Sequence, residues 1–300
     1  MTSGPSMTEV THTFFETRTR KQGLAALVPT MGFFHEGHLA LMSAARQAAD
    51  TVIVSLFVNP LQFNDPEDLK NYPRDLERDL EMAKAEKVDV LFAPSSEEMY
   101  AEPPLSRVEV SRVADHLEGP RRPGHFVGVA TVVAKLLAGV QPDLAFFGRK
   151  DAQQLALIKR MTKDLSFPVA ISGQPTIRET DGLALSSRNV FLDSADRAAA
   201  LSISTGLFAA AELAEAGEMS ALRLTESVIG KAKAVEIEYV TLASQDLAQP
   251  LDEIDRPAFL AIAARVGSVR LIDNIAFDIV SGQIIADRGR RLRRRSLLYG

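Results

Sequence analysis

Residues 23–49 form the segment that most constrains how this chain can fold. An apolar run at 23–28 ends at Pro29, as expected of a short buried parallel strand that meets a turn. From residue 39 onward apolar side chains recur about every 3.6 residues, which predicts an amphipathic helix beginning near residue 37. A strand that passes through a tight turn into a helix is the unit from which α/β folds are built.

The turn of this segment carries two histidines, His35 and His38, and two glycines, Gly32 and Gly37. The first N–H groups of a helix lack partners within the helix and form the positive end of its dipole, so they attract an anion. Glycines let the backbone approach a phosphate closely. The alternative is that one histidine caps the helix and the other is a surface side chain. The register of strand, glycines and helix favours a phosphate-binding turn.

Further short apolar runs are separated by segments with helical periodicity, and they occur at residues 51–58, 88–93, 144–147 and 169–173. Strands that alternate with helices predict a mostly parallel sheet with helices on both faces. Ligands of such sheets bind at the carboxyl ends of the strands. We therefore expect the polar loops at 59–63 and 148–154 to follow their strands toward the same edge as the phosphate-binding turn.

From about residue 193 the sequence becomes alanine-rich and predicts a second domain. It contains helix-like segments at 197–217 and 220–234 and strand-like segments at 237–242, 258–266 and 270–275, with a hairpin turn at Gly267-Ser268. The expected division is a Rossmann-like domain at 1–176, a smaller α+β domain at 177–287, and a basic tail at 288–300.

The composition narrows the class of protein. Three hundred residues with 46% hydrophobic content can form one large or two medium domains with a substantial core. The absence of cysteine excludes disulfides and thiolate chemistry, and it favours a cytoplasmic enzyme. We expect no structural zinc site, no signal peptide and no membrane span, because no apolar stretch reaches the roughly 20 residues that cross a bilayer.

The net charge of −5 is unevenly distributed along the chain. Six arginines lie near the C-terminus, at positions 288, 290, 291, 293, 294 and 295. Such a run can contact nucleic acid or an acidic surface. A solvated, flexible terminus is the interpretation we favour, so a nucleic-acid partner is not expected.

Two polar loops carry groups suited to a small substrate. Gln62 in the loop at 59–63 offers one acceptor and two donors, which suits a hydroxyl group and a carboxylate oxygen. The alternative is an amide that caps local backbone. In the loop at 121–126, Arg122 and His125 precede an apolar helix-like stretch, and this pairing adds to an anion site.

Residues 148–154 follow an apolar strand and precede a helix. Lys150 supplies a positive charge for a phosphate, Asp151 can accept from ribose hydroxyls, and Gln154 lies one helical turn beyond the lysine. The alternative is a helix start capped by Asp151. That alternative explains neither the lysine nor the glutamine.

Residues 176–189 combine a turn at Asp181-Gly182 with the sequence Ser-Ser-Arg-Asn. Two hydroxyls and a guanidinium predict a phosphate clamp that closes on a nucleotide. The alternative is an ordinary serine-rich loop, and the arginine within it favours the clamp.

These motifs occur in the order PTMGFFHEGH, NPLQF, RPGHF, GRKDAQQ and SSRN. In that order and spacing they resemble the pantothenate synthetase (pantoate–β-alanine ligase) family of the HIGH-motif nucleotidyltransferases. The resemblance covers residues 27–192 strongly, and the LIDN segment at 271–274 resembles the family's C-terminal domain. It implies a Rossmann-like core, a smaller lid domain and a homodimer. It also implies the ATP-dependent condensation of pantoate with β-alanine to pantothenate through a pantoyl adenylate, with release of AMP and pyrophosphate.

The resemblance implies a role for each motif residue. ATP would contact Pro29, Thr30, Met31, Gly32, Phe33, Phe34, His35, Glu36, Gly37, His38, Gly148, Arg149, Lys150, Asp151, Ile177, Leu185, Ser186, Ser187 and Arg188. Among these, the catalytic groups would be His35, His38, Lys150, Ser186, Ser187 and Arg188. Pantoate and β-alanine would contact Asn59, Gln62, Arg122, His125 and Gln154.

The residue types suit this chemistry. Pyrophosphate leaves with charge that histidine, lysine and arginine can stabilise, and a lid that excludes water protects an acyl adenylate from hydrolysis. Mg²⁺ is expected mainly on the phosphate oxygens of ATP. Where some family members are assigned magnesium ligands, this chain has Arg78, Asp79 and Met82, and Asp79 alone could serve.

The chain also departs from the family pattern. Arg149 replaces a common glutamate, Ala152 replaces an aromatic residue or histidine, and Phe33-Phe34 replaces a small residue followed by leucine. The alternative function is another adenylyl- or cytidylyltransferase of the same superfamily with a different acceptor. Gln62, Gln154 and the RPGHF motif argue against it.

Overall fold

The computed structural model describes residues 8–299 and divides into two compact units. The first comprises Met1–Ser111, Gly119–Phe147 and Leu157–Gln174, and the second comprises Arg112–Glu118, Gly148–Ala156 and Pro175–Gly300. The expected domain division also has a boundary near residue 175, but it places the short segments Arg112–Glu118 and Gly148–Ala156 in the first domain, whereas the structure groups them with the second unit. Residues 1–7 and Gly300, which the expected division includes, lie outside the described residues.

The first unit contains a six-stranded sheet in the order β1-β4-β3-β2-β5-β6. Its strands are β1 (Glu9–Thr11), β2 (Ala25–Thr30), β3 (Thr51–Leu56), β4 (Val90–Phe92), β5 (Leu144–Gly148) and β6 (Ala170–Gln174). Strand pairs β1/β4, β4/β3, β3/β2 and β2/β5 are parallel, which confirms the predicted Rossmann-like sheet. Because β2 and β3 are parallel neighbours, the segments that follow them leave the sheet at the same edge.

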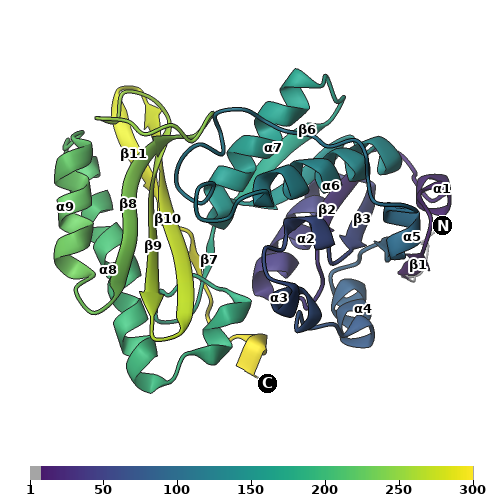
Figure 1. The fold of residues 1–300 in the computed structure, drawn as a ribbon, viewed down its shortest axis with the longest axis horizontal. Helices are drawn as coiled ribbons and strands as arrows, with labels where there is room; N and C mark the ends of the chain where they lie inside the picture. Colours follow the sequence, from purple (N-terminus) through teal and green to yellow (C-terminus); the bar gives the residue numbers. More distant parts are fainter. Residues whose placement is uncertain (1–7, 300) are drawn as a thin grey trace. The chain divides into compact units, whose positions relative to one another are not determined.

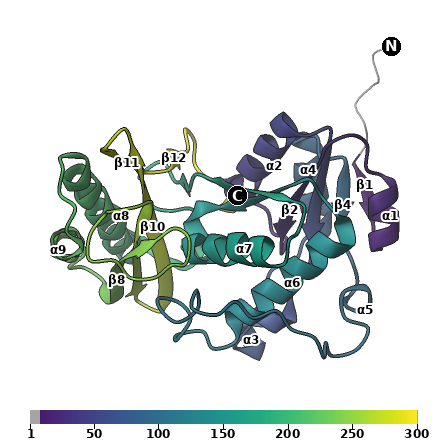
Figure 2. The same ribbon diagram turned by 90° about the horizontal axis from the view of Figure 1, so that it is seen from above.

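Helices cover both faces of this sheet. They are α1 (Phe14–Thr19), α2 (Glu36–Ala48), η1 (Pro60–Gln62), α3 (Pro66–Lys70), α4 (Leu76–Ala85), α5 (Ser96–Met99) and α6 (His125–Val140), while α7 (Ala152–Asp164) belongs to both units. α2 and α4 lie on one face and α6 on the other (Figures 1 and 2). The amphipathic α2 buries Leu41, Met42 and Ala45 against β2 and β3, so the helix start that follows the turn is rigidly placed.

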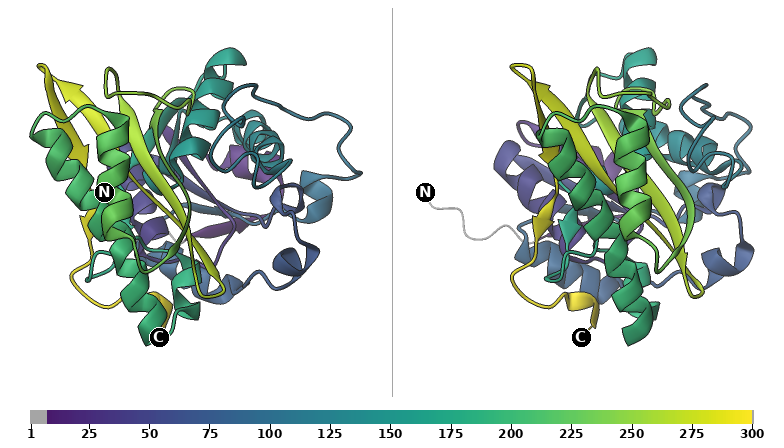
Figure 3. Two further views of the ribbon diagram at one scale, coloured as in Figure 1. Left: turned by 60° about the vertical axis from the view of Figure 1, so that its left-hand side comes forward. Right: turned by 90° about the vertical axis from the view of Figure 1, so that its left-hand side faces the viewer.

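The second unit contains a four-stranded antiparallel sheet in the order β11-β10-β9-β8. Its strands are β8 (Glu236–Ser244), β9 (Ala258–Val266), β10 (Val269–Val280) and β11 (Gln283–Asp287), and its helices are η2 (Arg149–Asp151), η3 (Ser187–Phe191), α8 (Ser194–Glu215), α9 (Ala221–Lys231) and η4 (Leu297–Tyr299). α8 and α9 cover one face of this sheet (Figure 3). The smaller α+β domain and the hairpin at Gly267 are therefore confirmed.

α8 is long and apolar enough to cross a membrane when judged by length and composition alone. Its buried residues Ala200, Ile203, Leu207 and Ala210 instead pack into the core shared with the antiparallel sheet. This is the pattern of a helix that belongs to a protein core.

The arginine-rich C-terminal segment differs from the expected flexible tail. β12 (Arg290–Arg291) pairs in parallel with β7 (Ile177–Arg178). The backbone N–H of Arg290 donates to the Thr176 carbonyl at 2.8 Å. Gly289 has a φ of +79°, and a Cβ at this position would lie 2.3 Å from the Thr176 carbonyl oxygen. The close approach of the two strands therefore requires glycine here.

Candidate functional site

A buried carboxylate holds the turn that follows β2. Both oxygens of Asp79, on α4, accept backbone N–H bonds at 2.7 Å, one from Phe33 and one from Phe34. Burial raises the pKa of the Asp79 carboxyl, and the two N–H bonds oppose that shift. The chain needs this support because Gly32 and Phe33 have φ values of +86° and +54°.

The two phenylalanines that depart from the family pattern have separate roles in this turn. The Phe34 side chain is fully buried in the core beneath α2. Phe33 is half-buried, and the Arg78 guanidinium lies 5.0 Å from its ring centroid. Phe34 therefore anchors the turn to the core, while Phe33 packs beneath an arginine at the surface.

His35 and His38 are fixed against the start of α2 and against each other. His35 is the N-cap residue, and its Nδ1 accepts the Gly37 N–H at 3.1 Å. His38 Nδ1 accepts the His35 N–H at 3.2 Å, and the two ring centroids are 4.1 Å apart. An Nδ1 that accepts an N–H bond carries no proton, so in a neutral ring of this kind the proton is on Nε2. Helix capping and a donor role are thus compatible in one residue.

Gly37 is required by this arrangement. A Cβ at residue 37 would lie 2.8 Å from Cε1 of the His35 ring, so any side chain there would displace the imidazole. The remaining residues of the motif surround the pair: Pro29 and Thr30 end β2, Met31 follows them, and Glu36 begins α2. The structure therefore brings the whole predicted turn together within the first unit.

Gln62 is oriented by a buried network. Asn59, 1% exposed, donates through Nδ2 to Gln62 Oε1 at 3.0 Å and to the Gly128 carbonyl at 3.1 Å. Asn59 Oδ1 accepts from the Tyr100 hydroxyl at 3.1 Å, and burial raises the pKa of Tyr100 to about 12. Gln62 Nε2 lies 3.2 Å from Met31 Sδ and carries two N–H groups, so it can donate further.

α6 supports the same loop from the other side. Nδ1 of the buried His125 lies 2.8 Å from the Gln62 carbonyl oxygen. A Cβ on Gly128 would lie 2.2 Å from the Leu61 carbonyl oxygen, so this glycine permits the close approach of α6 to η1. Arg122 is half-buried in the turn that precedes the helix. His125 and Asn59 therefore hold the Gln62 loop from within.

In the second unit, β5 leads through Gly148 into η2, where Arg149 and Lys150 are half-buried and Asp151 is exposed. The side chain of Arg149 lies 3.1 Å from Asp287 and 3.8 Å from Asp278. Arg149 thus has two carboxylate partners within the second unit.

The SSRN loop is braced by a cluster of polar side chains. Ser186 caps η3 by accepting the Arg188 N–H at 3.3 Å, Ser187 is half-buried and Arg188 is exposed. The buried Asn189 donates to Glu179 at 2.7 Å, and Arg197 donates to the second Glu179 oxygen at 2.6 Å.

Strand β7 lies beside this loop. The Leu185 N–H donates to the Ile177 carbonyl at 2.9 Å, which brings these two predicted ATP residues together.

The two glutamines that follow Lys150 have different environments. Gln153 is 5% exposed. Its Nε2 donates to the Val113 and His116 carbonyls, and its Oε1 accepts the Glu118 N–H. Gln154, the predicted substrate residue, is half-buried on α7. The segment 112–118 is therefore tied to the start of α7 by Gln153.

The described residues contain no cluster of side chains that resembles a protein metal cage. Over residues 8–299 there is no group of three or more histidine, cysteine, aspartate or glutamate side chains placed to hold a metal ion. Both oxygens of Asp79, the one candidate carried over from the family, accept backbone N–H bonds. The geometry assigns Asp79 to the shape of the turn.

Several residues that shape the site were not predicted from the sequence to act in these roles. Asp79, Tyr100, Asn274 and Arg178 act through contacts 41 or more positions away along the chain. For Asn274 the LIDN resemblance was a signal, although it pointed only to the C-terminal domain.

Comparison with known proteins gives a consistent result. A family model described as Pantoate-beta-alanine ligase matches residues 5–276. Proteins named pantothenate synthetase from Heliobacterium modesticaldum and Pelotomaculum thermopropionicum are 49% and 50% identical, over 87% and 86% of this chain and 94% and 93% of theirs.

Solved structures agree with the sequence relatives. Pantothenate synthetase from Thermus thermophilus superimposes with a TM-score of 0.83 at 44% identity, covering 88% of this chain and 98% of that one. The pantoate-beta-alanine ligase of Francisella tularensis, complexed with beta-gamma ATP and beta-alanine, gives a TM-score of 0.72 at 37% identity, covering 90% and 97%. This chain belongs to the pantoate–β-alanine ligase family, the enzymes that use ATP to join pantoate to β-alanine.

Proposed function

We propose that this chain makes pantothenate in two steps carried out by the residues described above. A carboxylate oxygen of pantoate attacks the α-phosphorus of ATP, and pyrophosphate leaves with the electrons of the broken P–O bond. The amine of β-alanine then attacks the acyl carbon of the pantoyl adenylate, AMP leaves, and the nitrogen loses a proton. The first step makes a poor acyl donor reactive, and the second uses that reactivity.

The observation that carries this proposal is that both His35 and His38 accept backbone N–H bonds at Nδ1. A neutral ring in this state carries its proton on Nε2, and both rings lie at a helix start, where the dipole also favours negative charge. Such donors stabilise the charge that develops on the phosphates as pyrophosphate leaves. His38 is the principal catalytic histidine, with His35 beside it.

Residues of the second unit complete the proposed set of ATP contacts. Lys150 and Arg188 supply positive charge to the phosphates, Ser186 and Ser187 donate hydroxyl hydrogen bonds, and Gly148 to Asp151, Ile177 and Leu185 contact the nucleotide. The family match supports this assignment, since all these residues lie within the matched range. A lid function of the second unit belongs to the same proposal, because excluding water protects the adenylate.

Pantoate is bound by Gln62 and Gln154, with Arg122 supplying positive charge and Gln62 also reaching β-alanine. The bond from Asn59 to Gln62 Oε1 fixes the orientation of the amide, and Gln62 binds the substrate through its Nε2 donor, which suits a carboxylate or hydroxyl oxygen. The burial of Asn59 and His125 is consistent with a supporting role for both, holding Gln62 in place.

Magnesium accompanies ATP in this proposal and binds its phosphate oxygens, because the described residues offer no protein cage.

The family resemblance further supports a homodimer and a cytoplasmic location. Sedimentation equilibrium tests the dimer directly.

Pyrophosphate release from ATP and pantoate, with and without β-alanine, tests the two steps separately. Pantoate alone should give one equivalent of pyrophosphate per active site, and β-alanine should make release continuous. His38→Ala should lower the adenylation rate by about 100-fold or more. His12→Ala, which changes a histidine outside the turn, is the matched control and should leave the rate unchanged. Near-normal release by His38→Ala would contradict the proposal.

Gln62→Ala tests the pantoate side. It should raise the KM for pantoate more than the KM for ATP, because Gln62 binds the acid. The reverse pattern would mean that Gln62 lies against the nucleotide.

A further inference from the structure

We propose that Asn274, on β10, is a positioning residue for Lys150, and that the Arg178–Asp273 ion pair fixes the backbone of Asn274 so that its side chain can do this. The inference rests on the proposed role of Lys150 in binding ATP phosphates. Asn274 Nδ2 donates to two successive carbonyls, that of Arg149 at 3.0 Å and that of Lys150 at 2.7 Å. One amide thus clamps the backbone of η2 at the residue whose side chain must reach the phosphate.

Side chains of β10 point alternately to its two faces, so one strand contributes residues both to the core and to the candidate site. Val269, Leu271, Ile275 and Phe277 belong to the core shared with α8 and α9. Side chains at even-numbered residues point to the opposite face of the strand, and Asn274 is one of these residues.

Arg270, another even-numbered residue of β10, is linked through Glu118 to Gln153 and so supports the segment 148–154 at a second position. Its guanidinium pairs with Glu118 at 2.7 Å, and the Glu118 N–H donates to Gln153 Oε1 at 3.0 Å. Arg270 and Asn274 therefore fix the GRKDAQQ segment from one face of β10.

The buried ion pair fixes the backbone from which Asn274 projects. Arg178 is 0% exposed, and its guanidinium donates to both oxygens of Asp273, at 2.7 and 3.1 Å, and to the Asn274 carbonyl at 3.2 Å. Asp273 Oδ1 also accepts the Asn274 N–H at 2.7 Å. Removing either partner would leave a buried charge unpaired.

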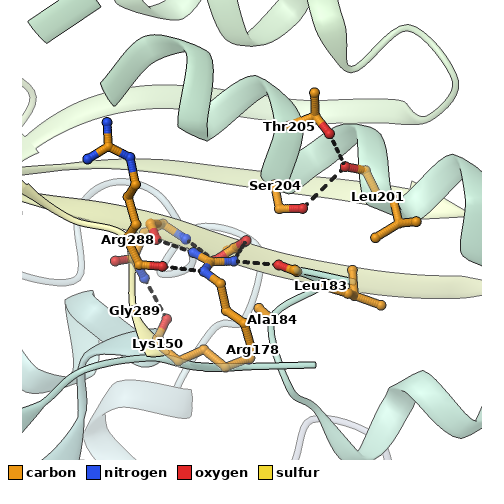
Figure 4. A network of polar contacts seen from close by, with 12 residues as sticks. Lys150, Arg178, Leu183, Ala184, Leu201, Ser204, Thr205, Arg288 and Gly289 are labelled. Atoms are coloured by element: carbon orange, nitrogen blue, oxygen red, sulfur yellow. Dashed lines mark hydrogen bonds and ion pairs between the residues drawn. The ribbon is translucent and has the colours of Figure 1, made fainter. Parts of the chain in front are cut away.

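Of the remaining Arg178 donors, one reaches the Arg288 carbonyl at 2.6 Å (Figure 4). The other reaches the Gly182 carbonyl at 3.3 Å. All five guanidinium N–H groups are thus used. Arg178, on β7, is therefore bonded to β10, to the turn before the SSRN loop and to the C-terminal segment.

Asn274→Ala tests the positioning role. Loss of two hydrogen bonds frees the η2 backbone, so we expect about a tenfold fall in kcat/KM for ATP in pantoate-dependent pyrophosphate release. The KM for pantoate should change little. Asn274→Ser, whose hydroxyl can still donate one bond, should fall between the wild type and alanine, and it carries the test if the alanine variant does not fold.

A double-mutant cycle separates positioning from general stability. If Asn274 acts through Lys150, adding Asn274→Ala to a Lys150→Ala variant should cause no further loss in kcat/KM for ATP. The matched control is Gln245→Ala, which removes another amide that donates to two backbone carbonyls, those of Ala258 and Phe277. It should lower the melting temperature and leave kcat/KM for ATP unchanged.

The possible results distinguish failure of this inference from failure of the proposed function. A tenfold loss in the single variant that adds in full to the Lys150→Ala loss overturns the positioning role, as does wild-type behaviour of Asn274→Ala. If Lys150→Ala itself keeps full activity, the proposed ATP role of Lys150 is wrong, and the inference fails with it. A vanishing effect of Asn274→Ala in the Lys150→Ala background supports it.

Discussion

His38 Nδ1 accepts the backbone N–H of His35 at 3.2 Å, and this bond closes a capping box in which each histidine uses the same ring atom. In other capping boxes the two side chains are a hydroxyl or carboxylate and a glutamate or glutamine. The two imidazoles accept the N–H groups of His35 and Gly37 through Nδ1, and a neutral ring in this state carries its proton on Nε2. The helix start is thereby stabilised by the same two residues that we propose as phosphate contacts.

His35→Asn separates the capping role from the phosphate role. Asparagine is a good N-cap residue, so this variant should retain a melting temperature close to the wild type, while adenylation falls because the ring donor is gone. His35→Ala should lose both stability and adenylation activity, and loss of the helix cap should lower the free energy of unfolding by about 1 kcal/mol. Thermal melting and pyrophosphate release measure the two effects. Equal activity in His35→Asn and the wild type would remove His35 from the proposed phosphate contacts.

Asp79→Asn tests whether this carboxylate shapes the turn or binds magnesium. An amide can accept only one of the two N–H bonds, so we expect a stability loss of about 1.5–3 kcal/mol and weaker ATP binding. If Asp79 holds the turn, raising the Mg²⁺ concentration should not restore activity. Restoration by excess Mg²⁺ would instead identify Asp79 as a metal ligand. ATP titrations at several Mg²⁺ concentrations provide the measurement.

Arg149→Glu examines the departure from the family pattern. The substitution places a third carboxylate beside Asp287 and Asp278, so it should lower the melting temperature. The charge exchange Arg149→Glu with Asp287→Arg should recover part of the loss, whereas Asp287→Arg alone should not. If Arg149→Glu melts like the wild type, the two aspartates do not explain the arginine.

Truncation after Asp287 tests the role of the C-terminal segment. It removes the β12 partner of β7 and the Arg288 carbonyl that accepts from Arg178 Nε. A lost bond from a charged donor is worth about 1.5–3 kcal/mol, so we expect a lower melting temperature and reduced ligase activity. Replacing Arg293, Arg294 and Arg295 with alanine in the full chain is the control and should leave more activity than truncation does. A truncated chain with full activity and stability would restore the interpretation of this segment as a free tail.

Local patterns were sufficient to predict much of this fold. The strand before Pro29, the helix after Gly37 and the hairpin at Gly267 depend on alternation, helical periodicity and turn residues, all of which act within a few positions. β7 and β12 were not predicted, because each has only two residues and exists through pairing with the other. The arginine run was mistaken for a free tail for the same reason, since the partners of Arg288, Glu215 and Arg178, lie 73 and 110 positions away along the chain.

The sequence by itself determined the family and the chemical groups available, because five ordered motifs carry the imidazoles, the lysine and the glutamines. It did not determine how those groups are held. That Asp79 supports the turn, that Asn59 sets the orientation of Gln62, and that Asn274 clamps the Lys150 backbone all depend on contacts made in the folded chain. Only tertiary structure decides such contacts, because a buried polar group takes whichever partner the packed core brings within hydrogen-bonding distance.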